Sequence, residues 1–523
     1  MTQENITNIP GSKILIVDYG GQYTHLIARR IRELEVYSEI VFYRDLNRVN
    51  IEDYDAVILS GSHLSVKNLD EDAVEMARKI LMEEDKPLLG ICFGHQLIGY
   101  LLGAKLSTGC GEYGRTTVKI LSSDALFNGW SNSEVVWMSH GECIEDLPDS
   151  ITLLAESENK VAAAIKAVVN NRVVYGVQFH PEVHHTVKGR RLLDNFLGII
   201  NAKRAWRTEN YYRCIIDELS REVTKNGVAV VGVSGGIDST VTALIGKKLF
   251  GDKLIPVFVD HGLLREGEKE LVVSSLEKLG LNPLVVDAGE RFISKLEGST
   301  DCEERRRVIG EEFARIFSEI IEKEGAEYFL QGTTYPDVIE SGGTRKAASV
   351  IKSHHNVGGL PEWFRGRVKI LEPLRLLYKD EVREIARLLG VPREIIERHP
   401  FPGPGLAVRV TGVFTRGKLD VCRRASKIVE DVLMEYGLYS RVWQAFAVVG
   451  DDRWVGVKGD ARSHGYIVTV RIVESVDGMT ADYSKIPYDV LDEISRRITN
   501  SIQDVTMVTY AITSKPPSTI EPC

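Results

Sequence analysis

The chain has 523 residues, of which 43% are hydrophobic and 27% are charged, and its formal net charge is −9. This length predicts about three domains, and the negative balance argues against a nucleic-acid partner. Residues 1–11 lack the basic and apolar segments of a secretory signal, and no apolar run reaches membrane-spanning length. We therefore expect a soluble, cytoplasmic protein with no membrane partner.

The cysteines show no CxxC pair, which argues against a zinc ribbon or a thioredoxin motif. Their odd number and scattered spacing predict reduced thiols in a cytosolic protein. The seven positions are Cys92, Cys110, Cys143, Cys214, Cys302, Cys422 and Cys523.

Strands and helices alternate in the first third of the chain, from KILIVDY at Lys13 through YDAVILS to KPLLGI. This alternation predicts a parallel sheet covered by helices on both faces. Cys92 directly follows the last of these strands, with Gly90 and Gly94 two residues to either side. Such glycines permit a tight strand-to-helix turn that exposes a nucleophile, and the helix N-terminus lowers the pKa of a thiol there. Cys92 is therefore the candidate nucleophile.

A thiolate nucleophile needs a base and a group that orients the base. The segment GVQFHPE supplies His180 and Glu182, which an extended backbone would place on one face. Together, GICFGHQ and GVQFHPE resemble the class I glutamine amidotransferases over about residues 13–201. The resemblance implies that Cys92, His180 and Glu182 form a triad that hydrolyses the side-chain amide of glutamine.

The same resemblance implies a glutamine and oxyanion site at Gly61, Ser62, Phe93 and Gln96, near the turn 111–114 and the segment Ser139–Glu142. One position departs from the family. The chain has Ser60-Gly61-Ser62-His63 where the family usually has SGGP. Because serine does not share the backbone freedom of glycine, we hypothesise that the oxyanion hole forms fully only when the synthetase domain is loaded.

A second motif begins at Val228–Val233, an apolar segment of strand length. It is followed by the loop Ser234-Gly235-Gly236-Ile237-Asp238-Ser239 and a helical pattern over Thr240–Phe250. The loop lacks the Gly-Lys-Ser/Thr ending of a Walker A motif and the spacing of GxGxxG. Its glycines bring backbone N–H groups close to an anion, and we expect Ser239 to cap the helix. Strand, loop and helix thus predict a phosphate site.

A carboxylate beside bound phosphate requires a cation, so Asp238 predicts Mg²⁺ bound together with ATP. SGGIDS resembles the pyrophosphatase loop of enzymes that form adenylates from ATP. The expected ATP-binding residues are Ser234, Gly235, Gly236, Asp238, Ser239 and Lys379.

Further segments downstream fit a nucleotide-using site. The strand Leu254–Val259 ends in Asp260-His261, at the edge of the sheet where adenosine is expected. Lys379 opens a helix and is a candidate to neutralise pyrophosphate. We interpret Lys352–Asn356, flanked by glycine pairs, as a mobile substrate loop. The basic run Arg305–Arg307 in an acidic chain suits a phosphate-bearing acceptor.

The ordered set SGGIDS, VDHGLLR, QGTTYPDVIES, IKSHHNVGGL, LEPLRLLYKDEVR and RHPFPGPGL resembles the glutamine-hydrolysing GMP synthase family over nearly the whole chain. The resemblance implies that xanthosine 5′-monophosphate (XMP) attacks the α-phosphate of MgATP and expels pyrophosphate. Ammonia released at Cys92 then displaces AMP to give GMP. It also implies a homodimer formed through the C-terminal region, and acceptor contacts from Arg306, Lys515 and Glu521.

The resulting prediction is an α/β protein with a class I glutaminase domain over 13–201. An adenine-nucleotide α-hydrolase-like, pyrophosphatase-loop domain follows over 208–398, and a C-terminal α+β dimerisation domain over 399–523. Two further positions depart from the family pattern. Cys302 stands where proline is more frequent, and the chain has Pro522-Cys523 where the family usually has Trp-Glu.

The sequence argues against three other functions. An asparagine synthetase needs its nucleophile at position 2, where this chain has Thr2, and a tRNA-thiolating enzyme usually carries CxxC pairs. A nucleotide- or glutamine-sensing module would keep the loops and lose the nucleophile. The intact set Cys92, His180, Glu182 and Asp238 argues against that last alternative.

Overall fold

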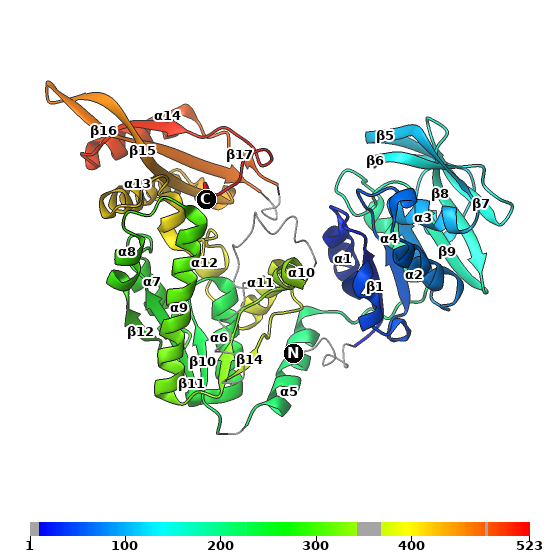
Figure 1. Ribbon diagram of the computed structural model, residues 1–523, viewed down its shortest axis with the longest axis horizontal. Helices are drawn as coiled ribbons and strands as arrows, with labels where there is room; N and C mark the ends of the chain where they lie inside the picture. Colours follow the sequence, from blue (N-terminus) through cyan, green and yellow to red (C-terminus); the bar gives the residue numbers. More distant parts are fainter. Residues whose placement is uncertain (1–9, 225, 343–367, 476–479) are drawn as a thin grey trace. The chain divides into compact units, whose positions relative to one another are not determined.

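The computed structural model describes residues 10–224, 226–342, 368–475 and 480–523 (Figure 1). They form two compact units, Met1–Cys214 and Ile215–Cys523, which are described separately. The boundaries of the three domains expected from the sequence stay a prediction. The segment Lys352–Asn356, interpreted above as a substrate loop, lies outside the described residues.

The first unit is built on a nine-stranded sheet in the order β2-β1-β3-β4-β9-β8-β7-β5-β6. Neighbours from β2 to β9 run parallel, which confirms the sheet predicted from the alternating elements. These parallel strands are β1 (Lys13–Asp18), β2 (Tyr37–Phe42), β3 (Ala56–Leu59), β4 (Leu88–Ile91) and β9 (Arg172–Val177). All four residues of β3 are buried, as expected for a strand covered on both faces.

An antiparallel extension continues this sheet beyond β9. Its strands are β5 (Lys105–Ile120), β6 (Ser133–Glu145), β7 (Ile151–Ser157) and β8 (Ala162–Val169). The helices of the unit are α1 (Thr24–Arg32), α2 (Glu71–Met82), α3 (Phe93–Leu101) and α4 (Gly189–Ile199). α2 begins where the Asp70 side chain accepts a hydrogen bond from the Ala73 N–H at 2.9 Å. The helix α5 (Thr208–Glu222) spans the junction of the two units.

The second unit contains a parallel sheet in the order β12-β11-β10-β13-β14. Its strands are β10 (Ala229–Gly232), β11 (Leu254–Asp260), β12 (Leu284–Asp287), β13 (Tyr328–Leu330) and β14 (Lys369–Leu371). The chain runs from β10 to one edge of the sheet and then returns to β13 on the other side. The strand order therefore reverses beside β10, and α/β sheets bind ligands at the carboxyl ends of the strands at such a point.

Helices cover this sheet on both sides (Figure 1). The helices of this part of the unit are α6 (Ile237–Phe250), α7 (Glu268–Lys278), α8 (Gly289–Leu296), α9 (Cys302–Glu324), α10 (Tyr335–Gly342), α11 (Lys379–Leu388) and α12 (Arg393–Ile396). α9 begins where the Asp301 carboxylate accepts from the Glu304 N–H at 2.7 Å.

A smaller sheet follows in the C-terminal part of the second unit. The strands β15 (Gln444–Lys458) and β16 (Ala461–Glu474) form a long antiparallel hairpin (Figure 1). β17 (Asp482–Tyr483) and β18 (Val505–Tyr510) both pair with β16. The helix α13 (Arg416–Glu435) packs on β15 and against α14 (Tyr488–Ser501). One apolar core reaches from Val230 in β10 to Val468 in β16, so both sheets belong to one folded unit.

The prediction that the cysteines are reduced is wrong for two pairs. Disulfides join Cys110 to Cys143 and Cys302 to Cys523. Their partners lie 33 and 221 positions apart in sequence, and only the folded chain brings them together. Cys92, Cys214 and Cys422 lie outside these two disulfides. Within the described part of the chain, none of the helices has the length and apolarity needed to span a membrane.

Candidate active sites

Cys92 lies at a sharp turn between β4 and α3, with φ 54° and ψ −103°. A Cβ atom on Gly90 would lie 2.4 Å from the Gly94 carbonyl oxygen, and one on Gly94 would lie 2.4 Å from the Leu59 carbonyl oxygen. The backbone therefore closes this turn only with glycine at both positions. The Cys92 N–H donates to the Val177 carbonyl at 2.8 Å, which ties the turn to the neighbouring strand β9.

The strands β3, β4 and β9 are neighbours, so their carboxyl ends bring Gly61, Cys92 and His180 together. A Cβ on Gly61 would lie 3.3 Å from Cε1 of His180 and 3.8 Å from Cβ of Cys92. The Nδ1 atom of His180 lies 2.7 Å from Oε1 of Glu182, and both side chains are buried. The three residues of the expected triad thus form one cluster.

The electrostatics of this cluster favour a charged pair. Burial by itself would lower the pKa of His180, but the Glu182 carboxylate and the Cys92 sulfur, which hydrogen-bonds to the ring, raise it well above its usual value. An imidazolium held in this way is a proton donor next to Cys92. Arg30 Nε donates to the Glu182 carbonyl at 3.1 Å and fixes the segment that follows His180.

The side chain of Ser62 makes hydrogen bonds that fix the position of this residue, and its backbone does not adopt the positive φ that favours glycine. Its Oγ donates to the Tyr19 carbonyl at 2.8 Å and accepts from the Leu64 N–H at 3.0 Å. Ser62 is not among the described residues with positive φ. Phe93 opens α3, so its N–H is one of the helix donors without an intrahelical acceptor.

Gln96 lies one turn after Cys92 and binds β6. Its Nε2 donates to the Glu142 carbonyl at 2.7 Å and to Oε1 of Gln178 at 3.2 Å. The Cys92 thiol lies 3.6 Å from the Ser139 carbonyl oxygen, on the same strand. The segment Ser139–Glu142, expected at this cleft from the sequence, therefore borders the nucleophile.

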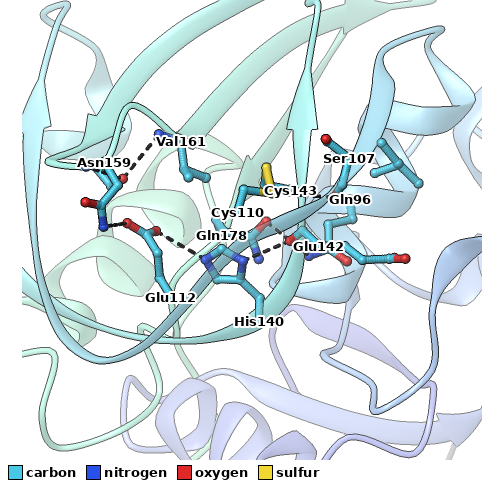
Figure 2. Close-up of a disulfide and its surroundings, with 12 residues drawn as sticks. Gln96, Ser107, Cys110, Glu112, His140, Glu142, Cys143, Asn159, Val161 and Gln178 are labelled. Atoms are coloured by element: carbon cyan, nitrogen blue, oxygen red, sulfur yellow. Dashed lines mark hydrogen bonds and ion pairs between the residues drawn. A yellow bond between two sulfur atoms is a disulfide. The ribbon is translucent and has the colours of Figure 1, made fainter.

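A buried polar pair fixes β5 against β6 next to this segment (Figure 2). The Nδ1 atom of His140 lies at 2.8 Å from the Glu142 carbonyl oxygen. Its Nε2 atom lies at 3.2 Å from Oε2 of Glu112. Asn159 donates to the other Glu112 oxygen at 2.8 Å. The Cys110–Cys143 disulfide crosses the same strand pair at the bulge of β5 (Figure 2). Sequence reasoning missed the pairing of Glu112 with His140, because only the register of β5 on β6 brings the two residues together. It also missed Asn159 as a partner of Glu112.

The glycine loop of the second unit connects β10 to α6. Gly235 has φ +77°, and a Cβ there would lie 2.4 Å from Cγ2 of Val272. Ser239 Oγ accepts from the Ser234 N–H at 3.1 Å and donates to the Gly236 carbonyl at 3.0 Å. The prediction that Ser239 caps the helix is wrong, since Gly236 is the N-cap and Ser239 lies inside the first turn. Ser239 instead holds the loop closed on itself.

The loop lies at the carboxyl end of β10, beside the reversal of strand order. Asp238 is in the first turn of α6. The chain after β13 approaches it closely, since a Cβ on Gly332 would lie 3.3 Å from the Asp238 carbonyl oxygen. Lys379 is an exposed residue at the start of α11, which packs against α6. These expected ATP-binding residues therefore belong to elements that adjoin one another.

The segment from Arg398 to Arg409 connects this loop to the end of the chain. Arg398 Nη1 would lie 3.1 Å from a Cβ on Gly235. Arg409 is almost fully buried and donates to both carboxylate oxygens of Glu521, at 2.8 and 3.1 Å. Gln444 Nε2 donates to the same carboxylate at 2.6 Å. Burial opposes the charge on Arg409, yet Glu521 raises the pKa of its guanidinium above the usual value.

The basic run Arg305–Arg307 is divided among three environments. Arg305 is buried and donates to main-chain carbonyls, including that of Ser299 at 2.7 Å. Arg306 is buried and donates to the Cys523 carbonyl, whereas Arg307 pairs with Glu311 on the helix surface. Lys515 is joined to Ala481 by backbone hydrogen bonds of 2.6 and 3.1 Å.

Three protein families match parts of this chain. The family described as "Glutamine amidotransferase class-I" matches residues 15–199, "NAD synthase" matches 211–317, and "GMP synthase C terminal domain" matches 431–522. A glutaminase unit followed by an ATP pyrophosphatase-type sheet defines a glutamine-dependent amidotransferase. This class was predicted from the sequence, and the expected α/β fold class is confirmed.

The similar proteins narrow this class to one family. The chain is 54% identical to a glutamine-hydrolysing GMP synthase of Pyrobaculum aerophilum, with 98% of this chain and 100% of the relative covered. It is 49% identical to one of Aeropyrum pernix, over 97% and 98% of the two chains. A Thermotoga maritima relative is 48% identical over 97% and 99%. The chain belongs to the glutamine-hydrolysing GMP synthase family.

Proposed function

We propose that Cys92, His180 and Glu182 hydrolyse glutamine, and that the second unit uses the ammonia to aminate XMP to GMP. ATP is converted to AMP and pyrophosphate through an adenylated XMP. As a member of its family, the chain is a carbon–nitrogen ligase with glutamine as amido donor. The observation that carries the residue assignment is the buried His180–Glu182 pair beside a cysteine on a glycine-closed turn.

Each residue of the glutaminase cluster has a role in this reaction. The Cys92 thiolate attacks the side-chain carbonyl carbon of glutamine, and His180 gives its proton to the departing ammonia. His180 then removes a proton from the water that hydrolyses the thioester. Glu182 holds the ring in the required orientation. Backbone N–H groups of Gly61, Ser62 and Phe93 are assigned to the developing oxyanion by resemblance to the family. Gln96 supports the wall formed by β6.

In the second unit, backbone N–H groups of the loop Ser234–Ser239 bind the phosphates of ATP at the start of α6. Lys379 neutralises the pyrophosphate that leaves. No group of three His, Cys, Asp or Glu side chains that could hold a metal ion occurs among the described residues. Asp238 fits Mg²⁺ as the single hard carboxylate that this ion needs when substrate phosphates supply further oxygens. Bound there, the ion would neutralise phosphate charge.

The acceptor XMP is assigned to Arg306, Lys515 and Glu521 by resemblance to the family. Arg409 and Gln444 support this assignment for Glu521, because they hold its carboxylate in one orientation. A homodimer through the C-terminal sheet is supported by exposed apolar side chains on the β15 hairpin, with Trp454 53% and Val457 76% exposed. We place the enzyme in the cytoplasm, where its nucleotide substrates are found.

The test is GMP formation from XMP and MgATP, with either glutamine or ammonium as nitrogen source. The wild type should use both, and Cys92→Ala should use ammonium alone, with its glutamine-dependent rate reduced at least about 10³-fold. A Cys92→Ala variant that still uses glutamine would remove Cys92 as the nucleophile. If neither nitrogen source yields GMP while ATP still binds, the acceptor assignment fails.

A further inference from the structure

The two positions at which the second unit departs from the family pattern contact each other. Cys302 is the first residue of α9, and Cys523 lies in the Pro522-Cys523 ending. A disulfide joins them, with their Cα atoms 5.9 Å apart. Neither half of this pair has a role in the reaction proposed above.

The start of α9 is a rigid anchor for this cross-link. Asp301 caps the helix through the Glu304 N–H at 2.7 Å. Arg306, one turn further on, is buried and donates to the Cys523 main-chain carbonyl. The same end of α9 therefore holds Cys523 twice, once through the disulfide and once through a charged hydrogen bond.

The rest of the segment Ala511–Cys523, here called the tail, contains no helix or extended strand. It is held by side chains of the C-terminal sheet. Arg471 donates to the carbonyls of Thr513 at 2.5 Å and Thr519 at 3.2 Å. Glu521 binds Arg409 and Gln444, two residues before the cross-link. A segment without its own secondary structure depends on such contacts for its position.

The tail also reaches the nucleotide loop through a short path of contacts. Glu521 binds Arg409, the last residue of the 3₁₀ helix Gly405–Arg409. Gly405 lies against the carboxyl end of β11, since a Cβ on it would be 3.0 Å from Cε1 of His261. Arg398, earlier in the same segment, lies against Gly235 of the loop. Fixing the tail therefore fixes Glu521 relative to the site where ATP is expected.

We propose that the Cys302–Cys523 disulfide is a positioning element for the acceptor nucleotide. By holding the end of the tail on α9, it keeps Glu521 and Lys515 in place for XMP before XMP arrives. The loss of conformational freedom on binding is then smaller, so the cross-link acts on XMP affinity and leaves the chemistry of ATP unchanged. This inference rests on the function proposed for the tail.

The experiment measures ammonium-dependent GMP formation, which does not require the glutaminase site. We expect the double variant Cys302→Ser/Cys523→Ser to raise KM for XMP about tenfold, with kcat and KM for ATP within about twofold of wild type. The matched control Cys110→Ser/Cys143→Ser removes the disulfide of the first unit. It should leave KM for XMP unchanged.

Treatment with dithiothreitol tests the same bond without a substitution. The dithiol gives two electrons and two protons to the disulfide, which becomes two thiols, and is itself oxidised to its cyclic disulfide. Wild-type KM for XMP should rise to the value of the double variant, and the double variant should not respond. This arm keeps the test decisive if the serine variants fold poorly.

The outcomes separate this inference from the proposed function. If KM for XMP, KM for ATP and kcat all change equally, or if none of them changes, the disulfide does not position the acceptor nucleotide and the proposal fails. Free thiols at both positions in the mass spectrum of unreduced wild type would also overturn the proposal. If wild type makes no GMP from XMP in either redox state, the proposed function itself fails.

Discussion

The turn that carries Cys92 depends on the absence of a Cβ atom at the glycines on either side of it. A Cβ on Gly94 would lie 2.4 Å from the Leu59 carbonyl oxygen. Because that oxygen belongs to the backbone, the clash can be removed only if β3 moves away from α3. β3 also leads into Gly61, which lies against His180. A change at Gly94 therefore reaches the nucleophile, the base and the oxyanion loop together.

We expect Gly94→Ala to destabilise the first unit by about 2 to 3 kcal/mol and to abolish glutamine-dependent GMP formation. Ammonium-dependent formation should persist. The measurement is the thermal transition of the protein together with both assays. Gly198→Ala on α4 is the matched control, because a Cβ there meets nothing within 4 Å. Equal effects of both variants would show that the close approach at Gly94 is not what matters.

A second prediction at this scale concerns Glu182. Its carboxylate helps to raise the pKa of His180, so Glu182→Gln should lower that pKa. The imidazolium that donates a proton to ammonia would then be lost at lower pH. We expect the alkaline limb of the glutaminase pH profile to move down by about one unit or more and kcat to fall at least about tenfold. An unshifted limb would mean that another group controls it.

At the scale of elements, α3 carries a buried histidine that affects stability. His95 is fully buried against Gly176 of β9, and burial lowers its pKa to about 3. A free histidine titrates near pH 6.5, so between these values the unfolded chain binds more protons than the folded chain. The stabilising contribution is complete above pH 6.5 and is lost as the pH falls toward 3.

We therefore expect the first unit to lose about 2 kcal/mol of unfolding free energy between pH 7 and pH 5 through His95 alone. His95→Gln should reduce this loss, and calorimetry of the two proteins across that range would measure it. His261 and His399 in the second unit have pKa values lowered to about 4 by burial and should destabilise that unit in the same pH range. Identical pH dependence in wild type and His95→Gln would contradict the assignment.

The elements also show how far sequence reasoning reaches. The strand, turn and helix around Cys92 could be predicted because apolar runs and flanking glycines are local signals. The parallel sheet that contains β3 and β4 followed from the alternation of elements, whereas the place of β9 beside β4 was not predicted. The bulge that places Glu112 opposite His140 depends on the register of β5 and β6, which no local pattern sets. Both disulfides were missed because their partners are 33 and 221 positions apart in sequence and only the folded chain brings them together.

At the scale of the whole molecule, the two sites lie in separately folded units, each on its own parallel sheet. The Ser62 side chain is engaged by Tyr19 and Leu64. We expect glutaminase activity to be low in the free enzyme and to rise at least about tenfold when MgATP and XMP are bound, as the oxyanion loop rearranges. Glutamate release with and without these nucleotides measures this.

The variant Ser62→Gly tests the cause of this coupling. Glycine removes both hydrogen bonds of the serine side chain and frees the backbone, so the variant should hydrolyse glutamine faster than wild type in the absence of nucleotides. Its response to MgATP and XMP should shrink accordingly. A wild type that hydrolyses glutamine at the same rate with and without nucleotides would refute the hypothesis.

The Cys302–Cys523 bond has a topological consequence for the second unit. It turns the chain from residue 302 to residue 523, a separation of 221 positions, into a covalent ring. In the chain-entropy model, closing a ring of this size lowers the conformational entropy of the unfolded state, and this loss stabilises the folded state by about 5 kcal/mol. A protease that cuts the ring once releases no fragment, since both new ends remain attached through sulfur. The cut becomes visible only after reduction, when the ring opens and the pieces separate.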